Sequence, residues 1–381
     1  MKILHIIGAF SNFGGVYEFH RKLKNGLSKY HVDNYYLGVK SYIDINDIES
    51  NSRILSDPSE IISYINELNP DIVHFHDGAS NYIGEGDRII DLISKGIKNR
   101  IKLRTIHSPN ESICPKVSTT YIESCGDCNK SLTYQCVTER KISDDMYHLF
   151  NEYLESLKEY DLITYFADYI SENLLKIGIE KSKLRKIPPL ISKSEVISMY
   201  KDNTILFVGR IVQWKGIRYL LKALSNLNTK DWKLIIAGKG DKDEIKYVMR
   251  EARDLSILNR IEFTGYIEQE KLANVYNRSK LMILPSIGHE GYCFAGAGAI
   301  SHGVPVIAFD VKGIEEWLTH QFNGLIVPVK DIDALANAID EVLSDQDLYS
   351  HLRRNCCEWN NSLCIEEQIA DIYNCYINLL S

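Results

Sequence analysis

The sequence has no apolar stretch long enough to cross a membrane and no excess of basic charge. None of its apolar runs reaches the ~18 residues that a membrane-spanning helix needs. Its 44 Lys and Arg residues face 51 Asp and Glu residues, a net charge of −7, which argues against a nucleic-acid partner. The start, MKILHIIGAF, lacks the charged lead and cleavage site of a signal peptide. We therefore expect a cytoplasmic protein.

Nine cysteines are too few, and odd in number, for a disulfide framework in a chain of 381 residues. Because the sequence shows no sign of export, we expect these cysteines to be free thiols or metal ligands rather than disulfides. Apolar residues make up 45% of the sequence, enough for a large buried core. At about 150 residues per domain, the length suggests two or three domains.

Short apolar runs alternate with longer amphipathic stretches along the whole chain. KILHIIGAF, DIVHFHD and IKLRTIHS read as buried strands, and the pattern restarts after Pro188 and Pro189 with NTILFVGRI and KLIIAGKG. Such alternation predicts parallel sheets covered by helices. We expect an α/β protein with two doubly wound, Rossmann-like domains, at residues 1–190 and 191–364, and a final helix at 365–381. Ligands of such sheets bind at the carboxyl ends of the strands.

The phosphate-binding motifs of two common enzyme classes are absent. There is no GxxxxGKS or GxxxxGKT, so the chain is not a P-loop protein. In GKGDKD, which contains Gly238 and Gly240, Asp243 stands at the third glycine of a dinucleotide fingerprint. Gly14 and Gly15 precede the first predicted helix, where free backbone amides favour an anion. Taken alone, the pair favours a tight strand-to-helix turn that binds nothing over an anion site.

The second half places cations and a glutamate after predicted strands. In FVGRIVQWKG, Gly209 and Arg210 directly follow a strand, and Lys215 precedes a helix. An arginine that can bind bidentately and a lysine that acts as a point charge suit a diphosphate. In LPSIGHEG, Ser286 and Glu290 lie in a loop after another strand.

With these residues, the sequence resembles retaining glycosyltransferase family 4, whose fold is GT-B. The resemblance runs through GR, KG, AGKGD, FTGYI, LPS with EG, HGVPVIA and NGLIVP, in the family's order and approximate spacing. It implies a nucleotide-diphosphate sugar as donor and a glycan or lipid-linked hydroxyl as acceptor. It also implies a final helix that packs back on the N-terminal domain.

The resemblance assigns roles to individual residues. It implies that Arg210 and Lys215 clamp the donor diphosphate, that Glu290 supports the donor sugar, and that His107, after the strand IKLRTI, reaches the reaction centre. No metal ion is needed for such catalysis, because two side-chain cations replace it. The residues implied in donor binding are Gly14, Gly15, Gly209, Gly238, Gly240, Ser286 and Gly298.

Gly298 is where the chain departs from the family. A second glutamate, eight positions after Glu290, usually grips the ribose hydroxyls there. Losing such charged hydrogen bonds should cost about 1.5–3 kcal/mol. An active enzyme with a different ribose contact, a weakened enzyme, and a sugar- or nucleotide-binding protein without catalysis are the three interpretations. A nucleotide-sugar 2-epimerase of the same fold is a further alternative.

Four cysteines lie close together after His107: Cys114, Cys125, Cys128 and Cys136. Four thiolates can complete a tetrahedral Zn²⁺ shell, and the CGDC pair has a common ligand spacing. Structural zinc, reduced thiols, and a disulfide or iron–sulfur cluster remain open. We expect His74 and His76 to point to opposite faces of their strand and to be structural.

A basic run, KGIKNRIKLR at Lys95 to Arg104, is the one sequence feature that suggests peripheral membrane contact. It could meet anionic headgroups at the inner face of a membrane, as a lipid-linked acceptor would require. A solvated helix face accounts for it equally well.

Overall fold

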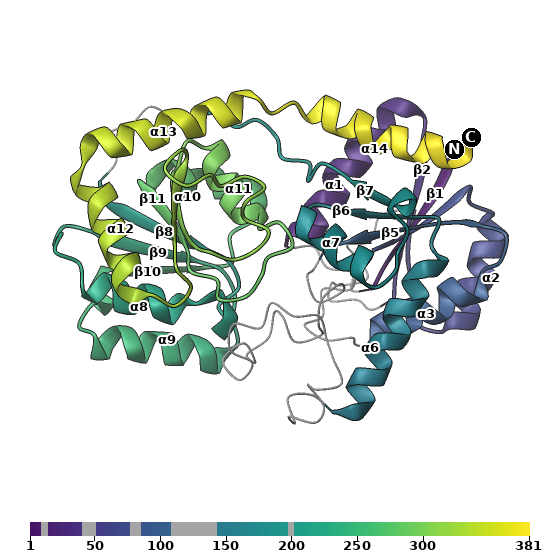
Figure 1. Ribbon diagram of the computed structural model, residues 1–381, viewed down its shortest axis with the longest axis horizontal. Coiled ribbons are helices and arrows are strands. Elements are labelled where there is room, and N and C mark those ends of the chain that lie inside the picture. The colour runs from purple at the N-terminus through teal and green to yellow at the C-terminus, as the bar shows by residue number, and fades with distance from the viewer. Residues whose placement is uncertain (9–13, 40–50, 77–84, 108–142, 197–201) are drawn as a thin grey trace. The chain divides into compact units, whose positions relative to one another are not determined.

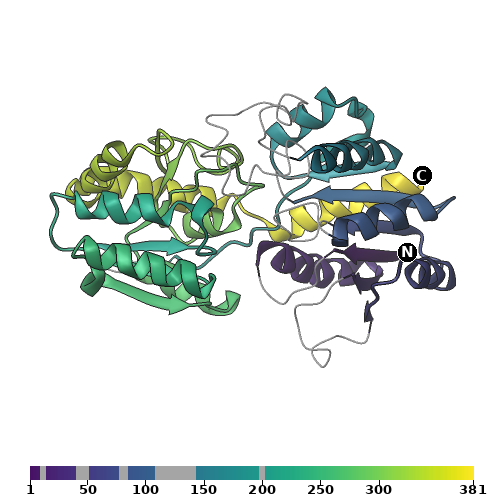
Figure 2. The same ribbon diagram turned by 90° about the horizontal axis from the view of Figure 1, so that it is seen from below.

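The computed structural model describes residues 1–8, 14–39, 51–76, 85–107, 143–196 and 202–381. The described chain forms two compact units. Unit 1 comprises Met1–Leu190 and Glu366–Ser381, and unit 2 comprises Ile191–Ile365. Each unit is a parallel sheet with helices on both faces (Figures 1 and 2). None of the helices in the described ranges combines the length and the apolar character needed to span a bilayer.

Unit 1 contains a seven-stranded sheet in the order β3-β2-β1-β4-β5-β6-β7. Its strands are β1 (Lys2–Ile7), β2 (Asp33–Gly38), β3 (Ser52–Ile54), β4 (Ile72–His76), β5 (Ile101–Ile106), β6 (Leu162–Tyr165) and β7 (Leu184–Lys186). Its helices are α1 (Gly15–Leu27), α2 (Pro58–Leu68), α3 (Glu85–Gly96), α6 (Asp144–Ser156), α7 (Asp168–Lys176) and α14 (Ile365–Leu380).

Unit 2 contains a six-stranded sheet in the order β10-β9-β8-β11-β12-β13. Its strands are β8 (Thr204–Val208), β9 (Lys233–Ala237), β10 (Ile261–Gly265), β11 (Leu281–Leu284), β12 (Val306–Phe309) and β13 (Gly324–Val327). Its helices are α8 (Ile217–Ser225), α9 (Lys242–Asp254), α10 (Gln269–Arg278), α11 (Phe294–Ser301), α12 (Ile332–Ser344) and α13 (Gln346–Asn361).

Local sequence accounts for where these elements form. The central strands are apolar on both faces, as strands covered by helices must be, and all four residues of β11 and of β12 are buried. Helix α2 begins where Asp57 caps the backbone amides of Ser59 and Glu60, with Pro58 at the first helical position. The apolar stripe of α14 buries Ile369 and its neighbours within unit 1. Its Asp371 also pairs with Arg185 at 2.7 Å.

Only part of the basic run at 95–104 faces solvent: Lys95 and Lys98 are exposed, whereas Arg104 is buried. Arg104 lies in β5 with only 1% of its surface exposed, next to the Tyr153 hydroxyl. The Lys102 ammonium donates to the Ser94 carbonyl, and Lys95 pairs with Asp91 at 2.7 Å. Lys102 and Arg104 are two residues apart on β5 and point to the same face of the strand, where Arg104 is buried, so only the charges that precede β5 face solvent.

Candidate functional site

Three loops carry the predicted residues of unit 2 to one edge of its sheet. They follow β8, β9 and β11, which are neighbours, and parallel strands end at the same edge. Backbone hydrogen bonds join the loops: Gly209 N donates to Ala237 O at 3.0 Å, and Ile287 N donates to Trp214 O at 2.9 Å. Arg210, Lys215, Ser286 and Glu290 are therefore held on one rigid edge.

The glycines of these loops are required by close backbone approach. Gly216, the residue before α8, has φ 69°, and a Cβ there would overlap the carbonyl oxygen of Pro285. A Cβ at Gly238 would overlap the carbonyl oxygen of Gly209, and one at Gly240 would overlap that of Ile211. Loop packing alone thus explains Gly238 and Gly240, whether or not a ligand approaches them.

Lys215 and Glu290 form a buried ion pair at the centre of this edge. Lys215 ends the short 3₁₀ helix at Gln213–Lys215, and its Nζ lies 2.6 Å from Glu290 Oε1. Ser286 Oγ donates to the same carboxylate oxygen at 2.5 Å. The two charged side chains are 13% and 6% exposed. Such a pair is held rigidly, because each charge depends on the other for compensation.

Trp214 lies beside both cations, a contact that the sequence did not reveal. The Lys215 ammonium lies 4.2 Å from the centroid of the Trp214 ring, and the Arg210 guanidinium carbon lies 5.9 Å from it. A tryptophan face attracts cations. The indole therefore helps to gather two positive charges next to the Glu290 carboxylate.

Gly298 lies inside α11, and its missing side chain would point at Tyr276. A Cβ at this position would lie 3.0 Å from the Tyr276 hydroxyl and 3.4 Å from its ring carbon Cζ. That phenol is buried, donates to Ala295 O at 3.0 Å and stacks on His302. A side chain at position 298 would therefore press against the Tyr276 ring, which its hydrogen bond and its stacking hold in place.

In unit 1, the predicted glycine pair lies at the start of a helix and His107 lies at the end of a strand, as the sequence predicted. Gly14 precedes α1 with φ 92°, and Gly15 begins the helix. His107 follows β5, where its ring packs edge-on against Phe19 and tilted against Phe166. Its Nε2 lies 3.1 Å from Nδ1 of His76, so the ring is part of a larger histidine cluster.

That cluster contains five histidines: His5 in β1, His20 in α1, His74 and His76 in β4, and His107. The expectation that His74 and His76 point to opposite faces is wrong, because side chains two residues apart on a strand point to the same face. Their ring centroids are 3.9 Å apart. Burial lowers the pKa of His5 to about 4 and the pKa of His20, His74 and His76 well below 6.5. These four rings are neutral at pH 7.

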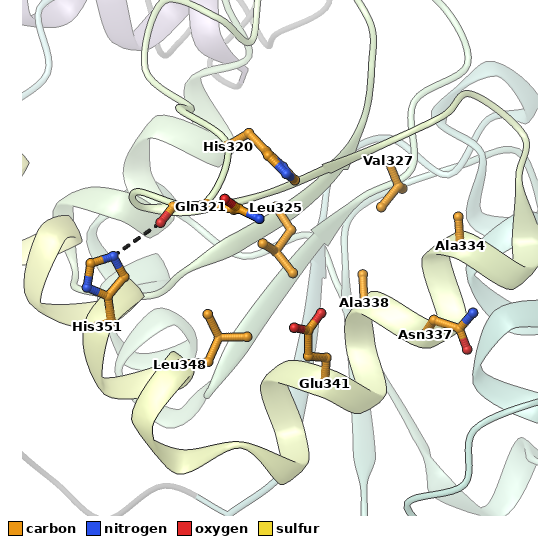
Figure 3. Close-up of a pocket in the computed structure, with 10 residues that line it drawn as sticks. All are labelled: His320, Gln321, Leu325, Val327, Ala334, Asn337, Ala338, Glu341, Leu348 and His351. Atoms are coloured by element: carbon orange, nitrogen blue, oxygen red, sulfur yellow. Dashed lines mark hydrogen bonds between the residues drawn. The ribbon is translucent and has the colours of Figure 1, made fainter.

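Other predicted or prominent features lie elsewhere. Cys114, Cys125, Cys128 and Cys136 fall outside the described residues. A pocket in unit 2 lies between β13, α12 and α13, with His320, Glu341, Leu348 and His351 among its lining residues (Figure 3). It contains none of the predicted site residues, and His351 is held there by a contact with the Gln321 carbonyl at 3.2 Å.

Residues 192–359 match the sequence model of a family described as glycosyl transferases group 1. An uncharacterized glycosyltransferase of Methanocaldococcus jannaschii is 24% identical over 322 residues, 81% of this chain and 76% of that protein. A phosphatidyl-myo-inositol mannosyltransferase of Mycolicibacterium smegmatis is 30% identical over 151 residues, 39% of this chain and 38% of that protein.

The solved structure of Anabaena HepE in complex with UDP is similar to this chain, with a TM-score of 0.71 and 15% identity. The match covers 98% of this chain and 100% of that one. This likeness, together with the two parallel sheets, confirms the predicted GT-B fold class.

Proposed function

We propose, from the match of residues 192–359 to the glycosyl transferases group 1, that this chain transfers a sugar from a nucleotide-diphosphate sugar to a hydroxyl of a glycan or lipid-linked acceptor. The observation that carries this proposal is the convergence of Arg210 and Lys215 beside Glu290 at one sheet edge. A UDP complex of a protein with the same fold supports a nucleotide diphosphate as the leaving group.

Charge grows on the leaving diphosphate as the bond to the sugar breaks. Cations that are already in place stabilise that charge without reorganising. The ion pair of Lys215 with Glu290 fixes the ammonium position before substrate binds, and Trp214 supports the same ammonium. Arg210 and Lys215 therefore act as the diphosphate clamp, and Glu290 both orients Lys215 and accepts hydrogen bonds from the donor sugar.

We extend the proposal to residues whose roles rest on the resemblance of their segments. Ser286 holds the Glu290 carboxylate, Gly14 and Gly15 offer backbone amides at the start of α1, and His107 contacts the donor sugar. The reaction retains the anomeric configuration, with the leaving phosphate taking the proton of the acceptor. Side-chain cations replace a metal ion in this step.

A lipid-linked acceptor is the more specific form of the proposal. It is supported by the similarity to a protein named as a phosphatidyl-myo-inositol mannosyltransferase. The basic run at 95–104 supports it through Lys95 and Lys98, which are exposed, and not through Arg104, which is buried. A cytoplasmic location, peripheral to the membrane where the acceptor would lie, stays a prediction.

The first test identifies the donor and then removes the clamp. Nucleotide diphosphates are screened by thermal shift, because a ligand that binds the folded chain raises its melting temperature. With the best donor, Arg210→Ala and Lys215→Ala should each lower kcat/KM by about 100-fold or more. Lys246→Ala and Arg278→Ala, which remove cations from exposed ion pairs of the same unit, should leave the rate unchanged.

Wild-type rates in both the Arg210→Ala and the Lys215→Ala variant would show that these two cations do not take part in the reaction. Turnover of the donor to an epimer without any acceptor would replace the transferase by an epimerase. An inverted anomeric configuration in the product, read by NMR, would contradict the retaining mechanism alone.

A further inference from the structure

We propose that His20, His76 and His107 form a binding site for a single transition-metal ion of the zinc type in unit 1. The three side chains come from α1, β4 and the end of β5. One ring nitrogen of each lies within 4.8 Å of the others. The proposal is independent of the four cysteines that follow His107, and it shares only His107 with the proposed transferase site.

Two of the three nitrogens already have the spacing of ligands on one ion. His76 Nδ1 and His107 Nε2 are 3.1 Å apart. In a tetrahedral zinc site with bonds of 2.0–2.1 Å, neighbouring ligand nitrogens are about 3.3 Å apart. The His20 ring stands edge-on to the His76 ring, with centroids 4.0 Å apart. A small rotation of these rings can therefore direct three lone pairs to a common point.

His20 is the residue whose surroundings point most directly to a ligand. It is 5% exposed, and among the described residues neither of its ring nitrogens has a hydrogen-bond partner. A neutral imidazole carries one donor and one acceptor, and a buried polar group without a partner is costly. A metal ion would use the lone pair of His20, which otherwise has no role in the packing of unit 1.

A chain of hydrogen bonds prepares His76 as a ligand. Asn34 Nδ2 donates to Val32 O at 3.2 Å, so its Oδ1 is the acceptor that faces His5 Nε2 at 3.1 Å. His5 therefore carries its proton on Nε2 and accepts through Nδ1 from His76 Nε2, also at 3.1 Å. This leaves the lone pair of His76 on Nδ1, toward His107. Metal-bound histidines typically have their second nitrogen fixed in this way.

The other histidine trio of the cluster, His5 with His74 and His76, fits a metal less well. Both nitrogens of His74 are engaged, Nδ1 with the Tyr376 hydroxyl at 2.9 Å and Nε2 with Thr105 Oγ1 at 2.6 Å. Imidazole ligands favour zinc, cobalt, nickel and copper, whereas Mg²⁺ and Ca²⁺ prefer oxygen. Three nitrogens would leave the fourth position of a tetrahedral ion for water or another ligand.

The experiment uses the full chain with Cys125 and Cys128 replaced by serine, so that any thiolate site is disabled. The protein is stripped with a chelator and titrated with Co²⁺ and Zn²⁺, and metal is counted after desalting. One ion per chain is expected, with the visible absorption of tetrahedral Co²⁺ and no thiolate charge-transfer band. Mg²⁺ and Ca²⁺ should not compete.

His20→Phe is the decisive variant, because it keeps an aromatic ring at this position and removes both ring nitrogens. It should weaken metal binding by about 100-fold or more, since even the loss of an outer-shell partner costs about 10–100-fold. Asn34→Ala tests that outer shell and should weaken binding by about 10–100-fold. His148→Phe, at a histidine whose side chain is 63% exposed, should change nothing.

Stability of the metal-free protein separates metal binding from folding. Without metal, His20→Phe should melt at the same or a higher temperature than the parent chain, because it removes two unpaired polar atoms. Zn²⁺ should raise the melting temperature of the parent chain and not that of His20→Phe. No metal uptake by the parent chain, or equal uptake by His20→Phe, would overturn the proposal and leave His76 and His107 as a plain hydrogen-bonded pair.

Discussion

Lys215→Met should destabilise unit 2 as well as abolish transfer, because it leaves the Glu290 carboxylate buried without its partner. The pair is 2.6 Å long, with side chains 13% and 6% exposed. Removing one partner of a buried pair costs about 3–5 kcal/mol. Since Ser286 still donates to Glu290, we expect the lower end, about 3 kcal/mol. In a domain of 150–250 residues this lowers the melting temperature by roughly 6–12 °C.

A second substitution tests whether the loss comes from the unpaired charge. In Lys215→Met with Glu290→Gln, both charges are gone and the amide oxygen still accepts from Ser286. Because the destabilising element is the uncompensated carboxylate, the double variant should recover at least about half of the lost stability. It should remain inactive, since the clamp cation is still absent. Lys246→Met, whose side chain is 71% exposed and whose partner Asp243 is 95% exposed, should cost less than about 0.5 kcal/mol.

The sequence itself supplies a selective assay. All four tryptophans, Trp214, Trp232, Trp317 and Trp359, lie in unit 2. Tryptophan fluorescence during urea denaturation therefore reports the unfolding of unit 2 alone. A Lys215→Met variant as stable as wild type, or a double variant less stable than Lys215→Met, would refute the buried ion pair as described.

Three further predictions follow from other parts of the chain. Gly298→Glu should lower the unfolding free energy of unit 2 by about 1–3 kcal/mol through overpacking against Tyr276. Adding Tyr276→Phe, which removes the nearest atom, should restore part of this free energy. An unchanged stability, monitored by tryptophan fluorescence, would contradict the prediction. Burial holds the pKa of His5 at about 4, below its ordinary 6.5, so its stabilising effect is present above pH 6.5 and is lost as the pH falls. Between pH 7 and pH 5, His5 alone should cost about 2 kcal/mol in chelator-treated protein, measured by urea denaturation followed by circular dichroism; a stability independent of pH over this range would mean that the ring is solvated. Protein purified without added zinc should carry one equivalent bound by thiolates, lost when Cys125 and Cys128 are replaced together, and elemental analysis with unchanged metal content would favour reduced thiols.

The sequence by itself determined the features that depend on neighbouring residues. Alternating apolar runs and amphipathic stretches predicted the strands and helices, and the final helix was expected to start at about Ile365 and end at Leu380, where α14 lies. Arg210 and Lys215 could be placed beside a strand end because parallel strands finish at one edge. The same rule places the loop of Glu290 at this edge, whereas its contact with Lys215 depends on the pairing of β8 with β11.

Which distant residues meet depends on strand order and side-chain direction, and only the tertiary structure shows these. His5, His20, His76 and His107 are far apart in sequence, and they meet because β1 pairs with β4, β4 pairs with β5, and α1 packs beside these strands. The ring of Tyr276 opposite Gly298 and the burial of Arg104 likewise depend on packing between elements. Periodicity along a chain shows which residues share a face, and only the fold shows what that face touches.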